Sequence, residues 1–375
     1  MNLTLEQVNG LPEKTWRWLG VNQKRIETEI PDPVSYAGPK IDCPAGGGVA
    51  VTAFDPACPE EWNVNEDRLF KGSKDLNGIG AEFGKLAGEN QNSGVRIEIE
   101  AGRRLPAPIV IEYDLDENNR TVIDQNLVVG EKDSEVTVVM VYRSPNGLKA
   151  FHGGLTRLYA KENAVIRLIQ VQLLGDETWH MGDVGALVEE LGSVHLLQAE
   201  MGAQNITVGC QARLKGKESS LTIDSIYLGD EERHIDINYI ARHEGKSSLS
   251  NINVKGALLD HSEKVFRGTI DFKRGASGSK GREEEYAILL SPAVRNRTAP
   301  LILCSEDDVD GQHAASTGKM DENKLFYLMS RGLTELDAKK MVIEAEFEPV
   351  TEKIPVLELK TAISDQVRKK LSKVE

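Results

Sequence analysis

Aromatic residues are scarce in this sequence: Phe, Trp and Tyr together make up 5% of the 375 residues, whereas glycine contributes 34. This composition favours a fold with many tight turns and stacked aliphatic layers over one with a large aromatic core. No uncharged apolar run approaches the roughly 20 residues of a membrane-spanning helix. The opening MNLTLEQVNG lacks the basic and apolar pattern of a secretion signal. The sequence therefore predicts a cytoplasmic protein with no membrane partner.

Cysteine and net positive charge are also in short supply. The chain has four cysteines without any CxxC spacing, which argues against a disulfide framework and against a zinc ribbon. They are Cys43, Cys58, Cys210 and Cys304. The net charge of -14 would repel nucleic acid and anionic membrane surfaces, so neither is expected as a partner.

The common catalytic motifs are missing as well. There is no GxSxG elbow and no HExxH helix, and neither glycine cluster, at 46–48 or 275–281, precedes the GK[ST] of a phosphate-binding loop. We interpret both clusters as turns between strands. Six of the seven histidines are interpreted as surface residues or hydrogen-bonded core residues: His152, His180, His195, His234, His243 and His261.

Residues 1–95 are predicted to form an N-terminal α/β region. Residues 3–21 are predicted to be helical, with an interruption near Gly10. Four prolines between positions 31 and 44 then favour loops and short strands. The segment 65–88 is predicted to hold one or two short helices.

Residues 96–318 contain many short alternating strands, and the charged turns between them recur at a nearly constant period. The steps are 30, 29, 26 and 28 residues, taking Ser134, Ala164, Ser193, Ser219 and Ser247 as equivalent points. With two strands per repeat, this period favours a right-handed parallel β-helix, in which each coil stacks on the last. A β-sandwich is the alternative, because it also has many short strands. The repeat alignment places Val165 and Leu221 inside and Lys217 at a corner.

Residues 319–375 are predicted to form a C-terminal helical region. Asp321 is expected to cap a first helix that ends at Gly332 in a left-handed conformation, and Thr334 to cap a second helix. After Pro355, a last helix is predicted to carry an apolar stripe of Leu359, Ile363, Val367 and Leu371. Such a stripe usually packs on its own protein, and a docking surface for a partner is the alternative.

Two side chains suited to metal binding precede this helical region. Cys304 ends a predicted strand, and His313 follows nine residues later among small residues. Adjacent strands would bring the two side chains close, and a thiolate and a neutral imidazole are suitable iron ligands. The alternative for Cys304 is a buried small hydrophobe. Two ligands are too few for a complete cluster site.

The C-terminal segments carry a family resemblance. The segment GQHAASTGKMDENKLFYLMSRGL, followed by MVIEAEFEPVTEKIP, resembles the C-terminal signature of the SufB/SufD family of iron–sulfur cluster assembly scaffolds. The segment FRGTIDFKRGASGSKGREEEYAILLSPAVRNRT, at 266–298, resembles the signature before it. Together they cover about the last 110 residues. The resemblance implies a non-catalytic scaffold that holds a transient iron–sulfur cluster at a subunit interface.

Within this family the chain resembles SufD more closely than SufB. SufB-like chains follow the corresponding histidine with a glutamate and carry a cysteine soon after the position of Thr298. This chain has Ala314 after His313, and its Cys304 is displaced. The resemblance implies that the imidazole of His313 binds iron or contacts a sulfur intermediate. It also implies that the partners are a SufB-type paralogue and a SufC-type ABC ATPase. The residues expected to dock the ATPase are Leu325, Phe326, Tyr327, Arg331 and Gly332.

Two alternatives remain. Within the family, the chain would be a self-sufficient homodimeric scaffold that pairs with a second copy of itself. In another class, it would be a β-helix polysaccharide lyase or hydrolase, with the three glutamates of 283–285 in a surface groove. We interpret that run of charges as a solvated turn instead. A flavin cofactor has no support in the sequence.

Overall fold

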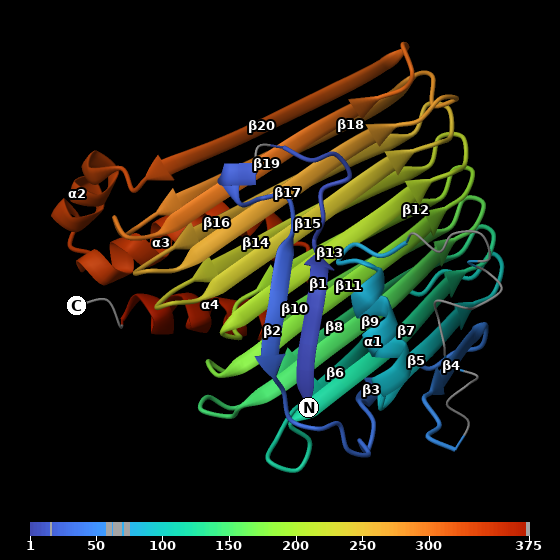
Figure 1. The fold of residues 1–375 in the computed structure, drawn as a ribbon, viewed down its shortest axis with the longest axis horizontal. Helices are drawn as coiled ribbons and strands as arrows, with labels where there is room; N and C mark the ends of the chain where they lie inside the picture. Colours follow the sequence, from blue (N-terminus) through green and yellow to red (C-terminus); the bar gives the residue numbers. More distant parts are fainter. Residues whose placement is uncertain (16, 58–61, 63–69, 71–75, 373–375) are drawn as a thin grey trace.

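The computed structural model describes residues 1–15, 17–57, 62, 70 and 76–372. In these residues two nine-stranded sheets lie face to face, and from β5 onward successive strands alternate between them (Figure 1). The even sheet contains β3 (Lys40–Asp42), β6 (Ile109–Asp114), β8 (Glu135–Arg143), β10 (Val165–Leu173), β12 (Ser193–Glu200), β14 (Ser220–Gly229), β16 (Leu249–Leu258), β18 (Ser279–Leu289) and β20 (Val309–Lys319). The odd sheet contains β4 (Val49–Ala53), β5 (Ser93–Ile99), β7 (Thr121–Gly130), β9 (Ala150–Ala160), β11 (Thr178–Val188), β13 (Asn205–Leu214), β15 (His234–His243), β17 (Glu263–Phe272) and β19 (Arg295–Cys304).

Neighbouring strands from β5 to β20 pair in parallel, as they do in a solenoid whose coils stack on one another. Parallel pairing excludes the β-sandwich, whose sheets are antiparallel. The predicted parallel β-helix is therefore confirmed. Its interior is a ladder of small and aliphatic side chains, mostly Val, Ile, Leu and Ala, joined by four tyrosines and one phenylalanine.

The pairing register of the even-sheet strands can be compared with the repeat positions predicted from the sequence. The first residues of β8, β10, β12, β14 and β16 stack in register at steps of 30, 28, 27 and 29 residues. Ser134, Ala164 and Ser219 are truly equivalent, whereas Ser193 and Ser247 are each one residue out of register. Leu221 points inward as predicted. Val165 does not, because it lies one residue before the buried Ile166, and one residue reverses the face in a strand.

The corners before these strands share a backbone conformation. Five residues, each two positions before an even strand, have φ between 54 and 61: Asp133, Asn163, Leu191, Glu218 and Ser247. A left-handed residue reverses the chain tightly, and polar residues such as Asn and Asp adopt it most readily. The repeated conformation explains why charged and small residues recur at the period seen in the sequence.

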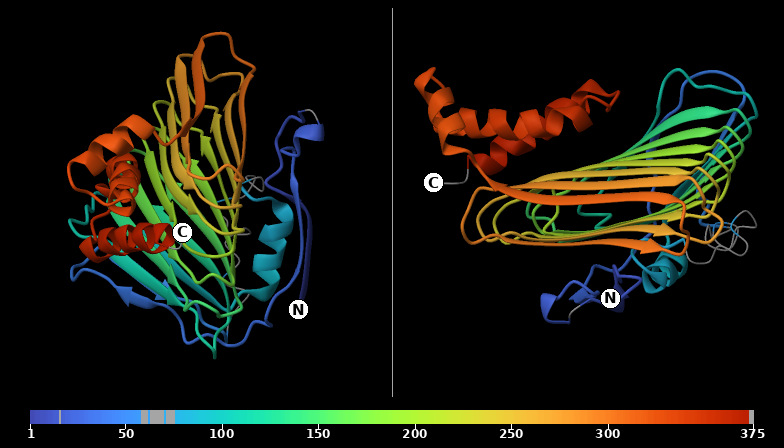
Figure 2. Two further views of the ribbon diagram at one scale, coloured as in Figure 1. Left: turned by 90° about the vertical axis from the view of Figure 1, so that its left-hand side faces the viewer. Right: turned by 90° about the horizontal axis from the view of Figure 1, so that it is seen from above.

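The N-terminal residues form a hairpin, so the predicted helix over 3–21 is wrong. Strand β1 (Asn2–Val8) pairs antiparallel with β2 (Lys24–Glu29), and a short 3-10 helix, Arg17–Leu19, lies between them. Leu3 and Leu5 are buried while their neighbours are exposed, which is the period of a strand. The hairpin and helix α1 (Ala81–Asn90) cover the outer face of the odd sheet (Figure 2). The rest of the helical prediction for 65–88 falls largely outside the described residues.

The C-terminal region contains three helices, α2 (Glu322–Ser330), α3 (Glu335–Thr351) and α4 (Leu357–Leu371). The predicted caps are present: the Asp321 side chain accepts hydrogen bonds from two backbone N–H groups, the Thr334 side chain accepts one, and Gly332 has φ 95°. Helices α3 and α4 pack on the outer face of the even sheet (Figure 2). None of the described helices combines the length and apolar character needed to cross a bilayer.

The apolar stripe of α4 packs on the chain itself. Leu359, Ile363, Val367 and Leu371 are all buried in the same cluster as outward side chains of the even sheet. Lys370, two helical turns after Ile363 and so on the same side of the helix, is also buried and forms an ion pair with Asp230, which in turn pairs with Arg233. The stripe is therefore a structural contact, and a docking surface must lie elsewhere.

Candidate site at the open end of the solenoid

The two ends of the solenoid differ. At the first coil, β3 and β4 pair antiparallel with β6 and β5 and cover the edges of both sheets. At the last coil, β19 and β20 are edge strands, and no further strand of the described residues pairs with them. We call this edge the open end. Nearly all of β20 is exposed to solvent, so its free backbone groups can pair with another chain.

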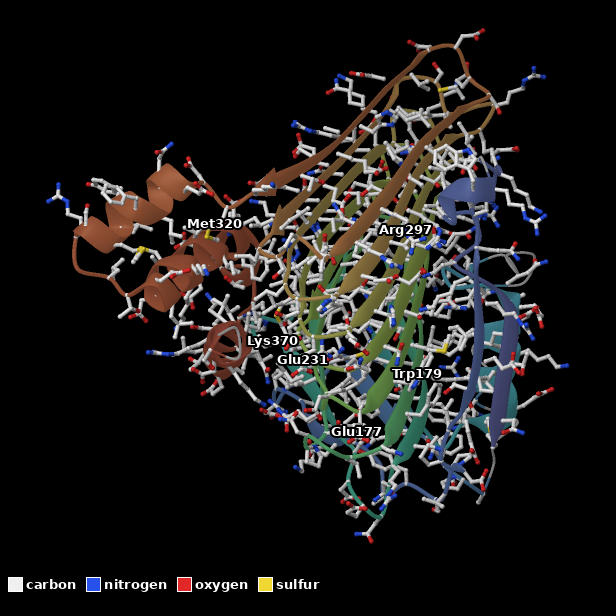
Figure 3. All side chains as sticks on the ribbon, turned by 60° about the vertical axis from the view of Figure 1, so that its left-hand side comes forward. Glu177, Trp179, Glu231, Arg297, Met320 and Lys370 are labelled. Carbon is white, nitrogen blue, oxygen red and sulfur yellow. The ribbon has the colours of Figure 1, made fainter. Side chains whose placement is uncertain are left out.

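The sequence candidate His313 lies in β20, on the face directed toward β19. Asn296 Nδ2 donates a hydrogen bond to Thr317 Oγ1 at 2.9 Å, and a Cβ on Gly311 would lie 3.1 Å from Ile302 Cγ2. These two contacts show which residues of β19 and β20 face each other across the interior. Counting along the two strands from either contact places Pro300 across from His313. Figure 3 shows the two strands, with Arg297 labelled on β19 and Met320 where the chain leaves β20 for the helices.

Cys304 does not join His313. By the same pairing it lies opposite Val309, at the exposed end of β19. That is four residues along the strand from the level of His313, or roughly 13 Å at about 3.3 Å per residue. The predicted closeness of the two side chains is therefore wrong. No three His, Cys, Asp or Glu side chains of the described part are placed to hold a metal ion by themselves.

A buried carboxyl group lies one coil beneath His313. Glu283 is its register partner in β18 and is only 1% exposed. Its carboxyl group lies against the backbone of Gly268, where an added Cβ would be 2.2 Å away. Burial, and secondarily Glu285, raises the pKa of Glu283 to about 8. Oε2 of Glu283 is buried and has no hydrogen-bond partner among the described residues.

A second buried carboxylate, Glu285, is fully paired. It forms an ion pair with Lys264 of β17, and it accepts hydrogen bonds from Thr298 Oγ1 at 2.5 Å and from the Tyr227 hydroxyl at 3.3 Å. Lys264 Nζ also donates to Thr298 Oγ1 at 3.0 Å. Burial lowers the pKa of Lys264, which Glu285 opposes. The inner face of the open end thus carries one exposed imidazole, one unpaired carboxyl group and one charge-paired carboxylate.

These side chains correct the interpretation of 283–285 as a solvated turn. The three glutamates lie in the middle of β18, where Glu283 and Glu285 point inward and Glu284 points outward and pairs with Arg282. Their burial alternates along the strand, but three identical residues show no alternation in the sequence. Carboxylates inside the solenoid cannot line a surface groove for a polysaccharide, so that alternative loses its basis.

A separate polar chain lies deeper in the solenoid. His152 contacts Asp124 with Nε2 at 2.7 Å and His180 with Nδ1 at 2.8 Å, and His180 Nε2 lies 3.7 Å from Glu200. All four side chains are buried, so His152 and His180 are core histidines with partners, as predicted. Burial, and then His152, lowers the pKa of His180, while burial raises the pKa of Glu200 to about 8.

Replacement of Glu200 by glutamine is expected to change the pH dependence of stability. Folded Glu200 keeps its proton up to about pH 8, whereas the unfolded carboxyl group loses it near its ordinary pKa. The wild-type protein therefore loses stability as pH rises between these values, and glutamine removes that loss. Urea unfolding at pH 5 and pH 8 should show Glu200→Gln gaining on the order of a few kcal/mol between the two pH values.

The control for this experiment is Glu284→Gln, on the outer face of the solenoid. It leaves the contributions of His180 and Glu283 in place and should follow the wild-type pH profile. Parallel profiles for Glu200→Gln and wild type would show that Glu200 is ionised in the folded protein at neutral pH.

The residues expected to dock an ATPase lie on α2 and just after it. Phe326 and Tyr327 are 74% and 56% exposed, and the Arg331 guanidinium lies 5.4 Å from the centre of the Tyr327 ring. Leu325 is half-buried, and Gly332 makes the left-handed turn into α3. An exposed aromatic pair with a stacked arginine has the composition of an interface hot spot, and its binding role stays a prediction.

Comparison with known proteins gives a consistent result. The chain is 25% identical over 282 residues to the iron–sulfur cluster assembly protein SufD of Bacillus subtilis, covering 75% of this chain and 64% of that protein. It is 23% identical over 348 residues to SufB of the same organism, covering 92% of this chain and 73% of that protein. It is 26% identical over 266 residues to a SufBD family protein of Pyrococcus horikoshii, covering 71% and 59%.

Not every relative is matched along its whole length. The aligned part of the chain spans 32% of a SufBD family protein of Mycobacterium leprae and 37% of one from Mycobacterium tuberculosis. The family model described as "SUF system FeS cluster assembly, SufBD core domain" matches residues 113–346. This range includes the solenoid from the end of β6 to β20, all of α2 and most of α3. With well over half of its length matched, the chain belongs to the SufBD family of the SUF system for iron–sulfur cluster assembly.

Proposed function

We propose that the chain is a SufD-like scaffold subunit, without catalytic activity of its own, that pairs through its open end with a SufB-type paralogue. The observation that carries this proposal is the position of His313 on the inner face of an unpaired edge strand. A partner that continues the two sheets would bring its own side chains next to this imidazole. Imidazole is a suitable iron ligand, so the joint would hold a nascent cluster between two chains.

The sequence around the site supports the SufD-like assignment. Ala314 follows His313 where SufB-like chains carry a glutamate, and Cys304 lies far from the imidazole level. This chain then offers nitrogen and oxygen ligands at the joint, and the sulfur ligands come from the partner. In the homodimeric alternative, a second copy would meet the same open end. We prefer the paralogue because the exposed Cys304 lies four residues along the strand from the level of His313, so this chain supplies no thiolate beside its own imidazole.

Co-purification tests the proposal. The native protein, purified with a mild affinity tag, should bring down a SufB-type chain and a SufC-type ABC ATPase, both identified by mass spectrometry. A second tagged copy of this chain, expressed together with the first, distinguishes the homodimer. Recovery of itself alone would support the homodimeric alternative, and recovery of neither a second copy nor a paralogue would contradict pairing through the open end.

The α2 surface gives a separate prediction for ATPase binding. Replacing Phe326 and Tyr327 together by alanine should reduce ATPase recovery at least tenfold, because large exposed aromatic residues provide much of the energy of such interfaces. The solenoid should stay folded, since neither side chain is buried. Leu357→Ala, which removes another exposed side chain from α4, is the matched control. Full ATPase recovery with the double variant would place the docking site elsewhere.

A further inference from the structure

Glu283 stands out among the buried charged groups of the solenoid. Elsewhere in the inner row, Glu285 has Lys264 and Thr298, and Asp124 has His152. Glu200 Oε2 also lacks a hydrogen bond but lies 3.7 Å from His180 Nε2, whereas the equally buried Glu283 Oε2 has neither a hydrogen bond nor an ion-pair partner among the described residues. Burying a carboxyl oxygen without a partner destabilises the fold, because the oxygen loses its hydration and gains no hydrogen bond in return. A group kept at such a cost in the last coil but one is expected to serve a ligand.

The backbone around Glu283 is shaped to accept this side chain. Gly268 lies opposite it in β17, and a Cβ there would come within 2.2–2.3 Å of the carboxyl atoms. Only glycine allows the carboxyl group to lie across the interior at this level. In the next and last coil, Pro300 is the register partner of Gly268 and His313 is that of Glu283, and β20 is exposed to solvent. One layer of side chains therefore separates the carboxyl group from the open end.

The distance between Glu283 and His313 suits a shared ligand. They are register partners on adjacent parallel strands, with both side chains on the inner face. Neighbouring strands are about 4.8 Å apart, so an ion between the two side chains can contact both. A carboxylate oxygen and an imidazole nitrogen are a donor pair that suits ferrous iron.

Resting on the proposed function, we propose that Glu283 and His313 form a two-ligand half-site for a divalent iron ion at the open end of the solenoid. The half-site supplies one oxygen and one nitrogen ligand. Its remaining positions are open to the partner chain or to sulfide. The role of this chain is thereby defined more closely: it holds iron through ligands that are not thiolates, while Cys304 stays outside the site.

The experiment titrates the full-length chain with Co²⁺ as a probe for ferrous iron and follows the histidine ring signals by NMR after isotope labelling. Paramagnetic broadening detects weak sites, as expected for two ligands, and the exposed His234 and His261 report non-specific binding in the same sample. His313 should broaden at a Co²⁺ concentration at least tenfold lower than these two. Glu283→Gln, which keeps the shape of the side chain, should remove that difference.

Glu284→Gln is the matched control, because it removes a neighbouring carboxylate that points outward from the same strand. It should leave the His313 titration unchanged. Thermal unfolding at pH 6 should be similar for both variants and wild type, which separates loss of a ligand from loss of fold. If His313 of Glu283→Gln broadens at the same Co²⁺ concentration as in the wild type, Glu283 is no ligand and the scaffold proposal is unaffected. If His313 broadens together with His234 and His261 in the wild type, the half-site is wrong.

Discussion

Replacing His313 with alanine is expected to abolish iron–sulfur cluster assembly in the cell while leaving the protein folded. The imidazole is exposed and makes no hydrogen bond with the described residues, so its loss should change stability by no more than about 0.5 kcal/mol. Partner recovery should also stay near normal, because backbone groups of β19 and β20 would make the joint. The measurement is the activity of an iron–sulfur enzyme in a strain that depends on this chain.

The control for this prediction is Cys304→Ser. The thiol is exposed but four residues from the level of His313, so the substitution should have a much smaller effect on the same enzyme activity. Normal maturation in the His313→Ala strain would make the histidine a surface residue without a role in the chemistry. A large loss of enzyme activity with Cys304→Ser and none with His313→Ala would contradict the assignment. This chain would then supply a thiolate in place of the imidazole.

Placing a charge in the inner ladder should unfold the solenoid. Leu221 and Ile166 are 1% and 0% exposed in neighbouring parts of the same core, and an aspartate at either position would be an unpaired buried charge. The expected loss is several kcal/mol, which is a large fraction of the stability of a typical domain. Because each coil is stabilised by its neighbours, the damage should spread along the stack. Urea unfolding and recovery of soluble protein measure it.

Two further substitutions calibrate this result. Lys217→Asp changes an exposed corner residue and should be nearly silent, apart from the loss of its contact with Glu218. Val165→Asp places the charge on the outer face, one residue from Ile166, and should cost clearly less than Ile166→Asp. Equal effects at 165 and 166 would mean that the register of β10 is different from the one described.

Local signals in the sequence predicted much of the fold. The turn residues of each coil recur because the same left-handed corner recurs, and this made the solenoid visible without an alignment. The caps at Asp321 and Thr334 are short-range and were also predictable. The N-terminal hairpin was not, since β1 pairs with a strand some twenty residues away and is buried by a sheet that lies far along the chain. Its alternation of Leu3 and Leu5 was the available signal.

The site was predictable only in part. His313 stood out through its family resemblance, whereas Glu285, Lys264 and Thr298 come from three different strands and meet only because the coils stack. The acidic run resembled a solvated turn because burial of charge is rare unless partners are present, and those partners are 13 and 21 residues away in the chain. Three consecutive glutamates show no alternation, so the sequence of that run did not reveal its inner and outer faces.

The different ends of the solenoid set a limit on assembly size. Two chains that join through their open ends use up the free edges of β19 and β20 on both sides. What they leave at the far ends is β3 and β4, short strands of 3 and 5 residues that run against the direction of the coils. Short edge strands of this kind pair poorly with further chains. In the part of the chain that the structure describes, such a pair leaves no long free edge strand on which a third chain could continue the stack, so growth into a fibre stops at two.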